Sequence, residues 1–270
     1  MQNRDVVALI KKEGAAFKII AEETLGISYG MLLIYPEKEI SEEKQSLLIK
    51  RLEMMKKQIP VQYILGKWEF EGREFKVGRG VLIPREDTEA VVSLAREVLE
   101  RKENAVFADL GSGSGCIAVS LNLETGAKGY AVERSKDAFG YLEENIKAHK
   151  ADVMAVNADM LAKETIQALP QLDLVVSNPP YITKEEMAEL DFSLSYEPKE
   201  ALFGGDDGLY FYKEICKSYY PKIKKGGAIA FEVGFRQADA VIDILKKAGF
   251  HSVKEKKDIN VVRRAVCAFK

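Results

Sequence analysis

From residue 105 onward, short apolar runs alternate with segments of helical periodicity, and this alternation limits the possible folds more than any other feature. Strands separated by helices form βαβ units, whose right-handed crossovers build a parallel sheet. The last two apolar runs follow each other without a helix, which predicts an antiparallel strand at one edge. The pattern predicts strands over 106–110, 129–133, 153–157, 172–176, 228–233, 252–256 and 264–269, and helices over 116–123, 136–148, 208–219 and 236–248.

The first 65 residues lack this alternation and have the pattern of a small helical domain. Ser41 is a good N-cap, because its side-chain oxygen can accept from a free helix amide, and Glu42 suits the positive end of a helix. Apolar residues then recur at helical spacing up to Pro60. A hairpin with its turn at Glu71-Gly72 follows. We therefore predict a helical domain over 1–65, a connecting hairpin over 66–84 and an α/β domain over 85–270.

The composition is that of a globular protein and excludes several classes. Apolar residues make up 47% of the chain and charged residues 30%, which suits a packed core and argues against disorder. No apolar stretch approaches the roughly 18–20 residues of a membrane helix, and we expect no secretory signal. The three cysteines, Cys116, Cys216 and Cys267, have neither metal-site nor disulfide spacing, so we expect no metal and a reducing, cytoplasmic location.

The charge is unevenly distributed along the chain. The net charge of −2 gives the whole molecule no electrostatic preference for nucleic acid. Residues 217–270 nevertheless hold 13 basic and 5 acidic side chains. This basic region could meet an acidic or nucleic-acid partner, or its lysines could be ordinary solvated side chains. Both interpretations stay open at this point.

The first strand of the α/β region runs into a glycine-rich turn that opens a helix. The turn reads Asp109-Leu110-Gly111-Ser112-Gly113-Ser114-Gly115. Glycines let the backbone turn tightly and approach a ligand, and the free amides of a helix start attract polar groups. Glu133 ends the next predicted strand about 20 residues later, where a carboxylate can accept both hydroxyls of a ribose. Turn and acid together predict a nucleoside ligand.

Two residues after the third predicted strand are candidates for the base of that nucleoside. Asp159 is a candidate acceptor for an adenine amino group, and Met160 could pack on the ring. An ordinary loop aspartate would give the same sequence.

The segment Ser177-Asn178-Pro179-Pro180-Tyr181 follows the fourth predicted strand, at the edge where open α/β sheets bind ligands. The prolines fix the backbone, so that the Asn178 side-chain oxygen and the Pro179 carbonyl can accept from one planar NH2 group beside the Tyr181 ring. Such a nitrogen is a poor nucleophile because its lone pair is delocalised. Two acceptors would aim it at an electrophile and stabilise the positive charge that develops on it. The motif predicts methyl transfer to an amide or exocyclic amine.

These motifs resemble those of the class I methyltransferases that use S-adenosyl-L-methionine (AdoMet) to methylate planar nitrogens. Over nearly its whole length the chain is similar to the protein-(glutamine-N5) methyltransferases of peptide chain release factors, the family called HemK or PrmC. Further similarity lies in residues 60–66, 82–89, 196–202 and 204–208. The resemblance implies a Rossmann-like domain with a mostly parallel seven-stranded sheet, joined by the hairpin to a helical domain that recognises the substrate.

The resemblance also implies roles for individual residues. AdoMet, which leaves as S-adenosyl-L-homocysteine, would be bound by Gly111, Ser112, Gly113, Ser114, Gly115, Glu133, Asp159, Met160 and Asn178. The catalytic residues would be Asn178, Pro179 and Tyr181, which together with Pro180 would also receive a glutamine amide.

Five further substrate contacts are expected, each with an alternative. Arg85, Thr88 and Glu89 could instead line the methionine end of AdoMet or brace the Asn-Pro-Pro-Tyr segment. Phe70 and Phe75 would wall the glutamine pocket or, with equal weight, form the core of the hairpin.

The implied reaction methylates N5 of a glutamine in a class 1 release factor, within the Gly-Gly-Gln motif expected from the family. We expect a monomer that binds neither membranes nor, directly, nucleic acid. Two alternatives stay open. One is a DNA or RNA adenine-N6 methyltransferase that uses the same segment on a flipped base, for which the basic region 217–270 is the best support. The other is a non-catalytic AdoMet-binding module.

Overall fold

The chain divides into two compact units in the computed structural model, which describes residues 1–190 and 192–270. Unit 1 comprises Met1–Lys67 together with Phe192–Tyr196, and unit 2 comprises the remainder of the chain. The hairpin that the sequence predicts as a connector falls almost entirely within unit 2. In the described ranges, no helix is long and apolar enough to cross a membrane.

Unit 1 is built from short helices around a small apolar core. They are α1 (Asn3–Glu13), α2 (Ala15–Leu25), α3 (Tyr29–Ile34), α4 (Glu42–Lys56) and α5 (Val61–Leu65). Ser41 caps α4 as predicted, since its hydroxyl accepts from the Lys44 amide at 3.4 Å. Phe17, Ile20 and Leu48 are completely or almost completely buried between the helices. Each helix therefore contributes apolar side chains to a shared core, while other apolar side chains of α3 and α4, such as Ile34 and Ile49, stay exposed.

The hairpin consists of β1 (Lys67–Phe70) and β2 (Arg73–Lys76). Its two turn residues, Glu71 and Gly72, have φ values of 46° and 70°. Positive φ at both positions is what a two-residue turn needs to match the twist of the flanking strands. The turn predicted at Glu71-Gly72 is confirmed.

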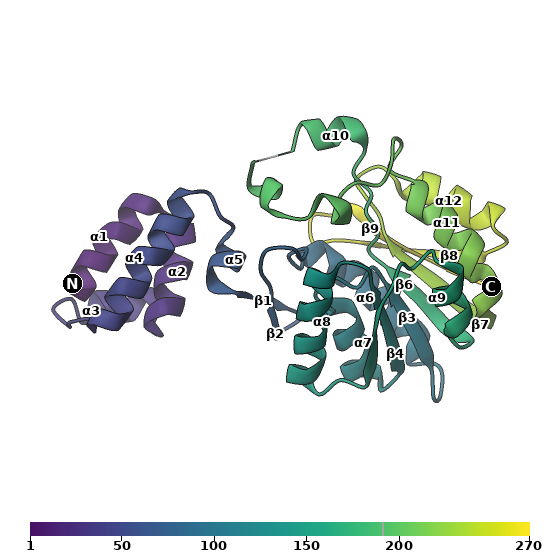
Figure 1. Ribbon diagram of the computed structural model, residues 1–270, viewed down its shortest axis with the longest axis horizontal. Helices are drawn as coiled ribbons and strands as arrows, with labels where there is room; N and C mark the ends of the chain where they lie inside the picture. Colours follow the sequence, from purple (N-terminus) through teal and green to yellow (C-terminus); the bar gives the residue numbers. More distant parts are fainter. Residues whose placement is uncertain (191) are drawn as a thin grey trace. The chain divides into compact units, whose positions relative to one another are not determined.

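The main sheet has the strand order β5-β4-β3-β6-β7-β9-β8 (Figure 1). The strands are β3 (Val106–Leu110), β4 (Lys128–Glu133), β5 (Val153–Asn157), β6 (Leu172–Ser177), β7 (Ile223–Glu232), β8 (His251–Lys257) and β9 (Arg263–Phe269). Strands β3 to β7 pair in parallel, whereas β9 runs antiparallel to both of its neighbours. The predicted antiparallel strand exists, but not at the edge: β9 inserts between β7 and β8, so β8 forms the edge.

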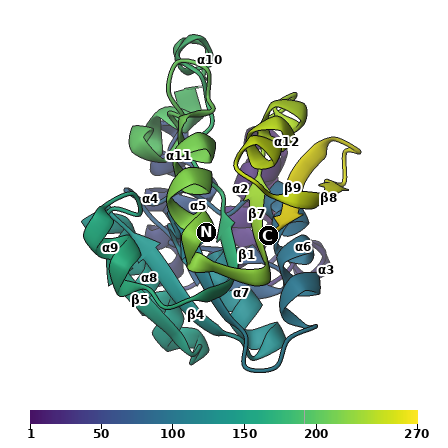
Figure 2. The ribbon, with the colours of Figure 1, turned by 90° about the vertical axis from the view of Figure 1, so that its right-hand side faces the viewer.

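Helices cover both faces of this sheet (Figures 1 and 2). Phe107 and Ala108 are neighbours in β3 but belong to different apolar cores, because successive side chains of a strand point to opposite faces. One core contains side chains of α6 (Glu89–Leu99), α7 (Cys116–Thr125) and α8 (Lys136–His149), and the other those of α11 (Tyr210–Tyr219) and α12 (Ala238–Lys247), with α9 (Lys163–Ala168) at its border. The shorter elements are α10 (Lys184–Ala188), η1 (Glu86–Thr88), η2 (Phe192–Tyr196), η3 (Lys199–Ala201) and η4 (Tyr220–Lys222).

A buried asparagine ties the hairpin to the glycine-rich turn. Asn145 of α8 is completely buried, and its Oδ1 accepts from the Lys76 amide at 2.7 Å. Its Nδ2 donates to the carbonyls of Lys76 and Ser114 at 3.0 and 2.9 Å. One completely buried side chain thus satisfies part-buried backbone groups of β2 and a buried carbonyl of the turn.

We expect Asn145→Ala to lower the free energy of unfolding by about 3 kcal/mol, because it leaves buried backbone groups without partners. Glu144→Ala is the matched control: it removes an exposed ion pair with the same Lys76 from the same helix and should cost below about 0.5 kcal/mol. Urea unfolding of the two variants measures both values, and equal losses would contradict the role given to Asn145.

Candidate functional site

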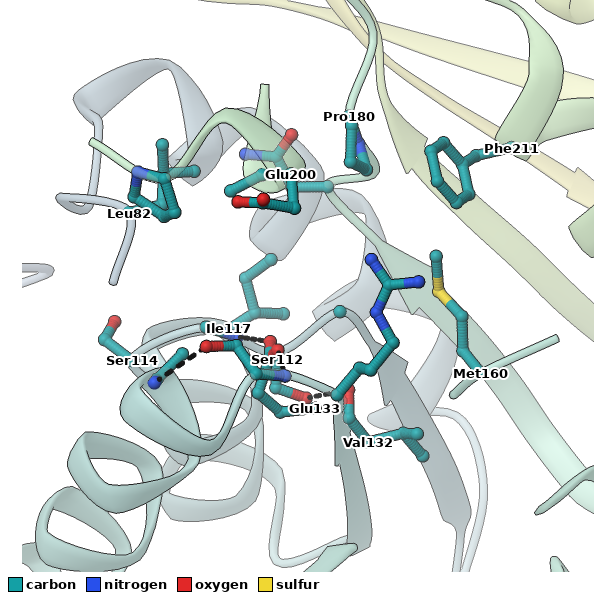
Figure 3. A pocket seen from close by; sticks show the side chains of 18 of the residues that line it. Leu82, Ser112, Ser114, Ile117, Val132, Glu133, Met160, Pro180, Glu200 and Phe211 are labelled. Atoms are coloured by element: carbon teal, nitrogen blue, oxygen red, sulfur yellow. Dashed lines mark hydrogen bonds between the residues drawn. The ribbon is translucent and has the colours of Figure 1, made fainter. Parts of the chain in front are cut away.

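A cavity of about 520 Å³ lies in unit 2 at the carboxyl edge of the sheet. The glycine-rich turn and Glu133 contribute one wall, and Asn178 and Pro180 contribute another. Figure 3 shows Pro180 and Glu200 across the cavity from Ser112 and Glu133. Because β3, β4 and β6 are adjacent and parallel, their carboxyl ends bring these distant segments together.

Backbone hydrogen bonds hold the glycine-rich turn. The amides of Gly111 and Ser112 both donate to the Val132 carbonyl, at 2.9 and 3.1 Å, which fastens the turn to β4. Gly115 begins α7 with φ +83°, and a Cβ atom there would lie 2.6 Å from Cδ1 of Leu142. The positive φ therefore favours glycine at this position, and any side chain there would also have to displace Leu142.

The Glu133 carboxylate lines the cavity and is fixed by two amides. Its Oε2 accepts from the Gly113 amide at 2.9 Å and its Oε1 from the Ser135 amide at 2.7 Å. Each carboxylate oxygen can accept more than one hydrogen bond, so both retain acceptor capacity toward the cavity. This arrangement suits a pair of ligand hydroxyls.

The predicted base-binding residues also line the cavity. Asp159 accepts from the Leu161 amide at 2.8 Å and lies 3.6 Å from Arg134, while the Met160 carbonyl accepts from the Tyr219 hydroxyl at 2.7 Å. The Met160 side chain reaches into the cavity beside Phe211 (Figure 3). Their role toward an adenine ring stays a prediction.

The Asn-Pro-Pro-Tyr segment follows β6 and presents two free acceptors. Ser177, the last residue of β6, donates its hydroxyl to the Leu110 carbonyl at 2.6 Å, so the two strand ends are fixed to each other. Within the described residues, no donor hydrogen-bonds to the Asn178 Oδ1 or to the Pro179 carbonyl. Pro179 itself is buried, and Asn178 is half-buried at the cavity.

Backbone packing holds this segment from outside the cavity. A Cβ atom at Gly204 would lie 2.6 Å from the Pro180 carbonyl oxygen and from Cα of Tyr181. Gln237 donates from Nε2 to the Tyr181 carbonyl at 3.0 Å. The segment is therefore held both by close main-chain packing at Gly204 and by the Gln237 side chain.

Two residues near this segment matter that the sequence did not single out as functional. Glu232, the last residue of β7, is 1% exposed and accepts from the hydroxyls of Thr88 and Tyr181, at 2.6 and 3.3 Å. Glu197 accepts from the Ile83 amide at 3.0 Å and pairs with Arg85. An acid at the carboxyl end of an apolar strand is the signal that identified Glu133, and it would also have identified Glu232.

Of the five expected further substrate contacts, two line the cavity and three do not. Arg85 and Thr88 line it, although Thr88 is almost completely buried. Glu89 begins α6 as an exposed residue outside the cavity wall. Phe70 and Phe75 do not line this cavity: they are 3% and 0% exposed and pack edge to face within the core that also holds side chains of α6 and α7, as the alternative of a core position expects.

Other reactive side chains offer no competing chemistry. Burial raises the pKa of the Cys116 thiol to about 12, so it is not a nucleophile at neutral pH. Among the residues that the structure describes, no cluster of histidine, cysteine, aspartate and glutamate could hold a metal ion.

Asp109 is completely buried under the glycine-rich turn, and neither carboxylate oxygen has a hydrogen-bond partner in the described part of the chain. Its pKa is raised to about 7, chiefly by burial and to a smaller extent by the nearby charge of Glu133. Ser112 and Ala118 lower it by less, since neither reaches the carboxylate with hydrogen-bond geometry. A buried acid without partners, directly below a ligand cavity, is typical of a functional site.

Comparison with known proteins shows similarity along most of the chain. Residues 88–194 match the Methyltransferase small domain, and residues 8–66 match the PrmC N-terminal domain. A release factor glutamine methyltransferase of Bacillus subtilis is 38% identical over 96% of this chain and 91% of its own.

Two solved structures share the fold at low identity. A methyltransferase from Pyrococcus furiosus has a TM-score of 0.56 at 17% identity, covering 85% of this chain and 99% of its own. The hMettl16 catalytic domain, in complex with the MAT2A 3′UTR hairpin 6, has a TM-score of 0.59 at 14% identity, covering 85% and 82%.

The buried acid gives a pH-dependent test of stability. Because the pKa of Asp109 is about 7 when folded and about 3.9 when unfolded, the wild-type protein should lose stability as the pH rises between these values. Asp109→Asn removes this loss. We expect the variant to be more stable than the wild type at pH 8, with the difference closing toward pH 4. Urea unfolding across this range measures it, and a difference independent of pH would contradict the assignment.

Proposed function

The chain belongs to the family of release factor glutamine methyltransferases, and we propose that it transfers the methyl group of AdoMet to the side-chain amide nitrogen, N5, of a glutamine in a peptide chain release factor. One observation carries the proposal. A glycine-rich turn with a fixed carboxylate and the Asn178 side chain, whose oxygen accepts no hydrogen bond from the described residues, line the same cavity, and the Pro179 carbonyl follows directly behind Asn178.

The cavity fits AdoMet by the chemistry of its walls. Gly111–Gly115 would approach the ligand, Glu133 would accept from the ribose hydroxyls, and Asp159 and Met160 would take the adenine. Asn178 would lie beside the methionine end. When bound, AdoMet supplies an electrophilic methyl group on a sulfonium centre. Arg85 carries a positive charge at the wall, balanced by Glu197, and could meet the carboxylate of the methionine end.

The Asn178 side chain and the Pro179 carbonyl would hold the glutamine amide. Its two N–H groups would donate to Asn178 Oδ1 and to the Pro179 oxygen, which fixes the nitrogen in one direction. Tyr181 and Pro180 would limit the space around the amide. As the nitrogen gains a methyl group it becomes positive, and both acceptors stabilise that charge until one proton leaves to water. No general base is needed before transfer.

The remaining parts of the proposal concern the protein substrate. A target within Gly-Gly-Gln is sterically suitable, because glycines let a chain pass close to the cavity wall formed by Pro180 and Glu200. Unit 1 would recognise the body of the release factor. We also propose a monomer that acts in the cytoplasm, where release factors work, without direct binding to nucleic acid.

The decisive experiment is methylation of a purified release factor, read by mass spectrometry of its glutamine-containing peptides. We expect one added methyl group on one glutamine with the wild-type enzyme. Asn178→Ala removes an acceptor and should lower kcat about 10²- to 10³-fold, with a smaller effect on the AdoMet dissociation constant.

Asn260→Ala, in an exposed turn far along the chain, is the matched control and should leave turnover unchanged. Duplex DNA and structured RNA are offered in parallel with the release factor. Label on nucleic acid alone would identify an adenine methyltransferase, and AdoMet binding without any acceptor would identify a binding module; either result overturns the proposal.

A separate measurement tests the cofactor site. Glu133→Ala removes the carboxylate that lines the cavity and should weaken AdoMet binding about tenfold or more, because the ribose hydroxyls would lose the charged acceptor proposed for them. Calorimetric titration gives the dissociation constant. An unchanged value would place the ribose elsewhere.

A further inference from the structure

Glu232 lies behind the Asn178 side chain, and we propose that it is a positioning residue: its carboxylate, acting through Thr88, keeps the Asn178 oxygen pointed at the substrate amide. This inference rests on the proposed function. Glu232 belongs to β7, and no other described residue of that strand is part of the site. Glu232 does not itself line the cavity.

Two hydroxyl groups fix the orientation of the Glu232 carboxylate, and a third bonds only to its main chain. Its Oε2 accepts from the Thr88 hydroxyl at 2.6 Å, and its Oε1 accepts from the Tyr181 hydroxyl at 3.3 Å. The Tyr212 hydroxyl donates to the Glu232 main-chain carbonyl at 3.0 Å. With its side chain 1% exposed, the carboxylate exchanges none of these donors with solvent.

The direction of the next hydrogen bond follows from this arrangement. An ionised carboxylate has no hydrogen, so the single Thr88 proton must point at Glu232. The Thr88 oxygen can then only accept from its other neighbour, which is Asn178 at 3.4 Å. Asn178 therefore directs Nδ2 at Thr88 and has Oδ1 free for the cavity. The carboxylate thus determines which atom of the asparagine amide meets the substrate.

A proton on Glu232 would reverse this chain. If the acid donated to Thr88, the Thr88 hydroxyl would turn toward Asn178 and would need an acceptor there. The Asn178 amide would rotate to supply Oδ1 to Thr88, and its NH2 group would face the NH2 group of the substrate. Two donors would then oppose each other where an acceptor is required.

The burial of Glu232 and the charges around it determine the pH at which it takes up a proton. The pKa of Glu232 is raised to about 7, chiefly by burial and to a smaller extent by the nearby Asp87 carboxylate. Thr88, Arg264 and Tyr181 favour the charged form. The groups that face Glu232 are therefore Asp87 and Thr88 from η1, Tyr181 from the segment after β6, Cys116 from α7, Tyr212 from α11 and Arg264 from β9.

The test compares Glu232→Gln with Thr88→Val, Thr88→Ser and Tyr212→Phe on a purified release factor. Glu232→Gln keeps the shape but adds donors, and Thr88→Val removes the relay; each should lower kcat about 10²-fold, as expected for a misplaced reacting group, with AdoMet affinity unchanged. Thr88→Ser keeps the hydroxyl and should recover most of the turnover lost in Thr88→Val. Tyr212→Phe touches only the Glu232 main chain and should keep wild-type turnover.

The pH profile separates positioning from a structural effect. The wild-type kcat/KM for release factor should fall below about pH 7, as Glu232 takes up a proton. This acid limb should be absent from Glu232→Gln and should persist in Asp109→Asn, which carries the other buried acid. Thermal unfolding of each variant confirms that the compared proteins are folded.

A binding measurement gives a readout independent of turnover. In Glu232→Gln the Asn178 NH2 group can face the cavity and donate to a carboxylate. We therefore compare the dissociation constant of the unchanged release factor with that of a release factor carrying glutamate in place of the target glutamine. The ratio of the two constants should favour the glutamate form more in Glu232→Gln than in the wild-type enzyme. If the wild-type enzyme methylates release factor and Glu232→Gln stays within about twofold of it with the same acid limb, the positioning role is wrong. If the wild-type enzyme itself does not methylate release factor, the proposed function is what fails.

Discussion

The site depends on a property of parallel strands: their carboxyl ends all emerge at one edge of the sheet. Adjacent strands β3, β4 and β6 therefore bring the glycine-rich turn, Glu133 and Asn178 to one cavity. Ser177 at the end of β6 and Leu110 at the end of β3 are hydrogen-bonded although 67 residues separate them in the sequence. Strand β7 adds Glu232 behind them. The site residues can therefore be far apart in the sequence, because the register of the parallel strands brings them together in space.

The elements that the sequence predicted best are those whose signals are local. The glycine-rich turn, the Glu71-Gly72 hairpin and the Ser41 cap each depend on a few consecutive residues, and all are present in the structure. The position of β9 required knowledge of strand order, which no local pattern contains. The role of Glu197 was missed for the same reason, because its partner Arg85 lies 112 residues away. Glu232 ends an apolar strand as Glu133 does, but its partners Thr88 and Tyr181 lie 144 and 51 residues away, so its role could not be read from the strand alone.

The two completely buried acids have different surroundings and therefore different consequences. Asp109 has no hydrogen-bond partner in the described chain, so its charge opposes folding, whereas Glu232 is surrounded by hydroxyls that accommodate the charge. Both have pKa values raised by burial to about 7. Buried acids with strongly raised pKa values are typical of functional sites. The methyltransferase is accordingly less stable at neutral pH than its apolar cores alone would make it.

The close packing of the Gly204 main chain against the Asn-Pro-Pro-Tyr segment limits how such an enzyme can evolve. Since Gly204 leaves no room for a side chain against Pro180 and Tyr181, the acceptor-holding segment has almost no tolerance for drift. A lineage that switched to another planar nitrogen would keep this segment and alter the side chains beside it on the same wall, such as Glu200 and Phe211. Retargeting by laboratory selection should begin at those positions, because variation there leaves the methyl-accepting geometry intact.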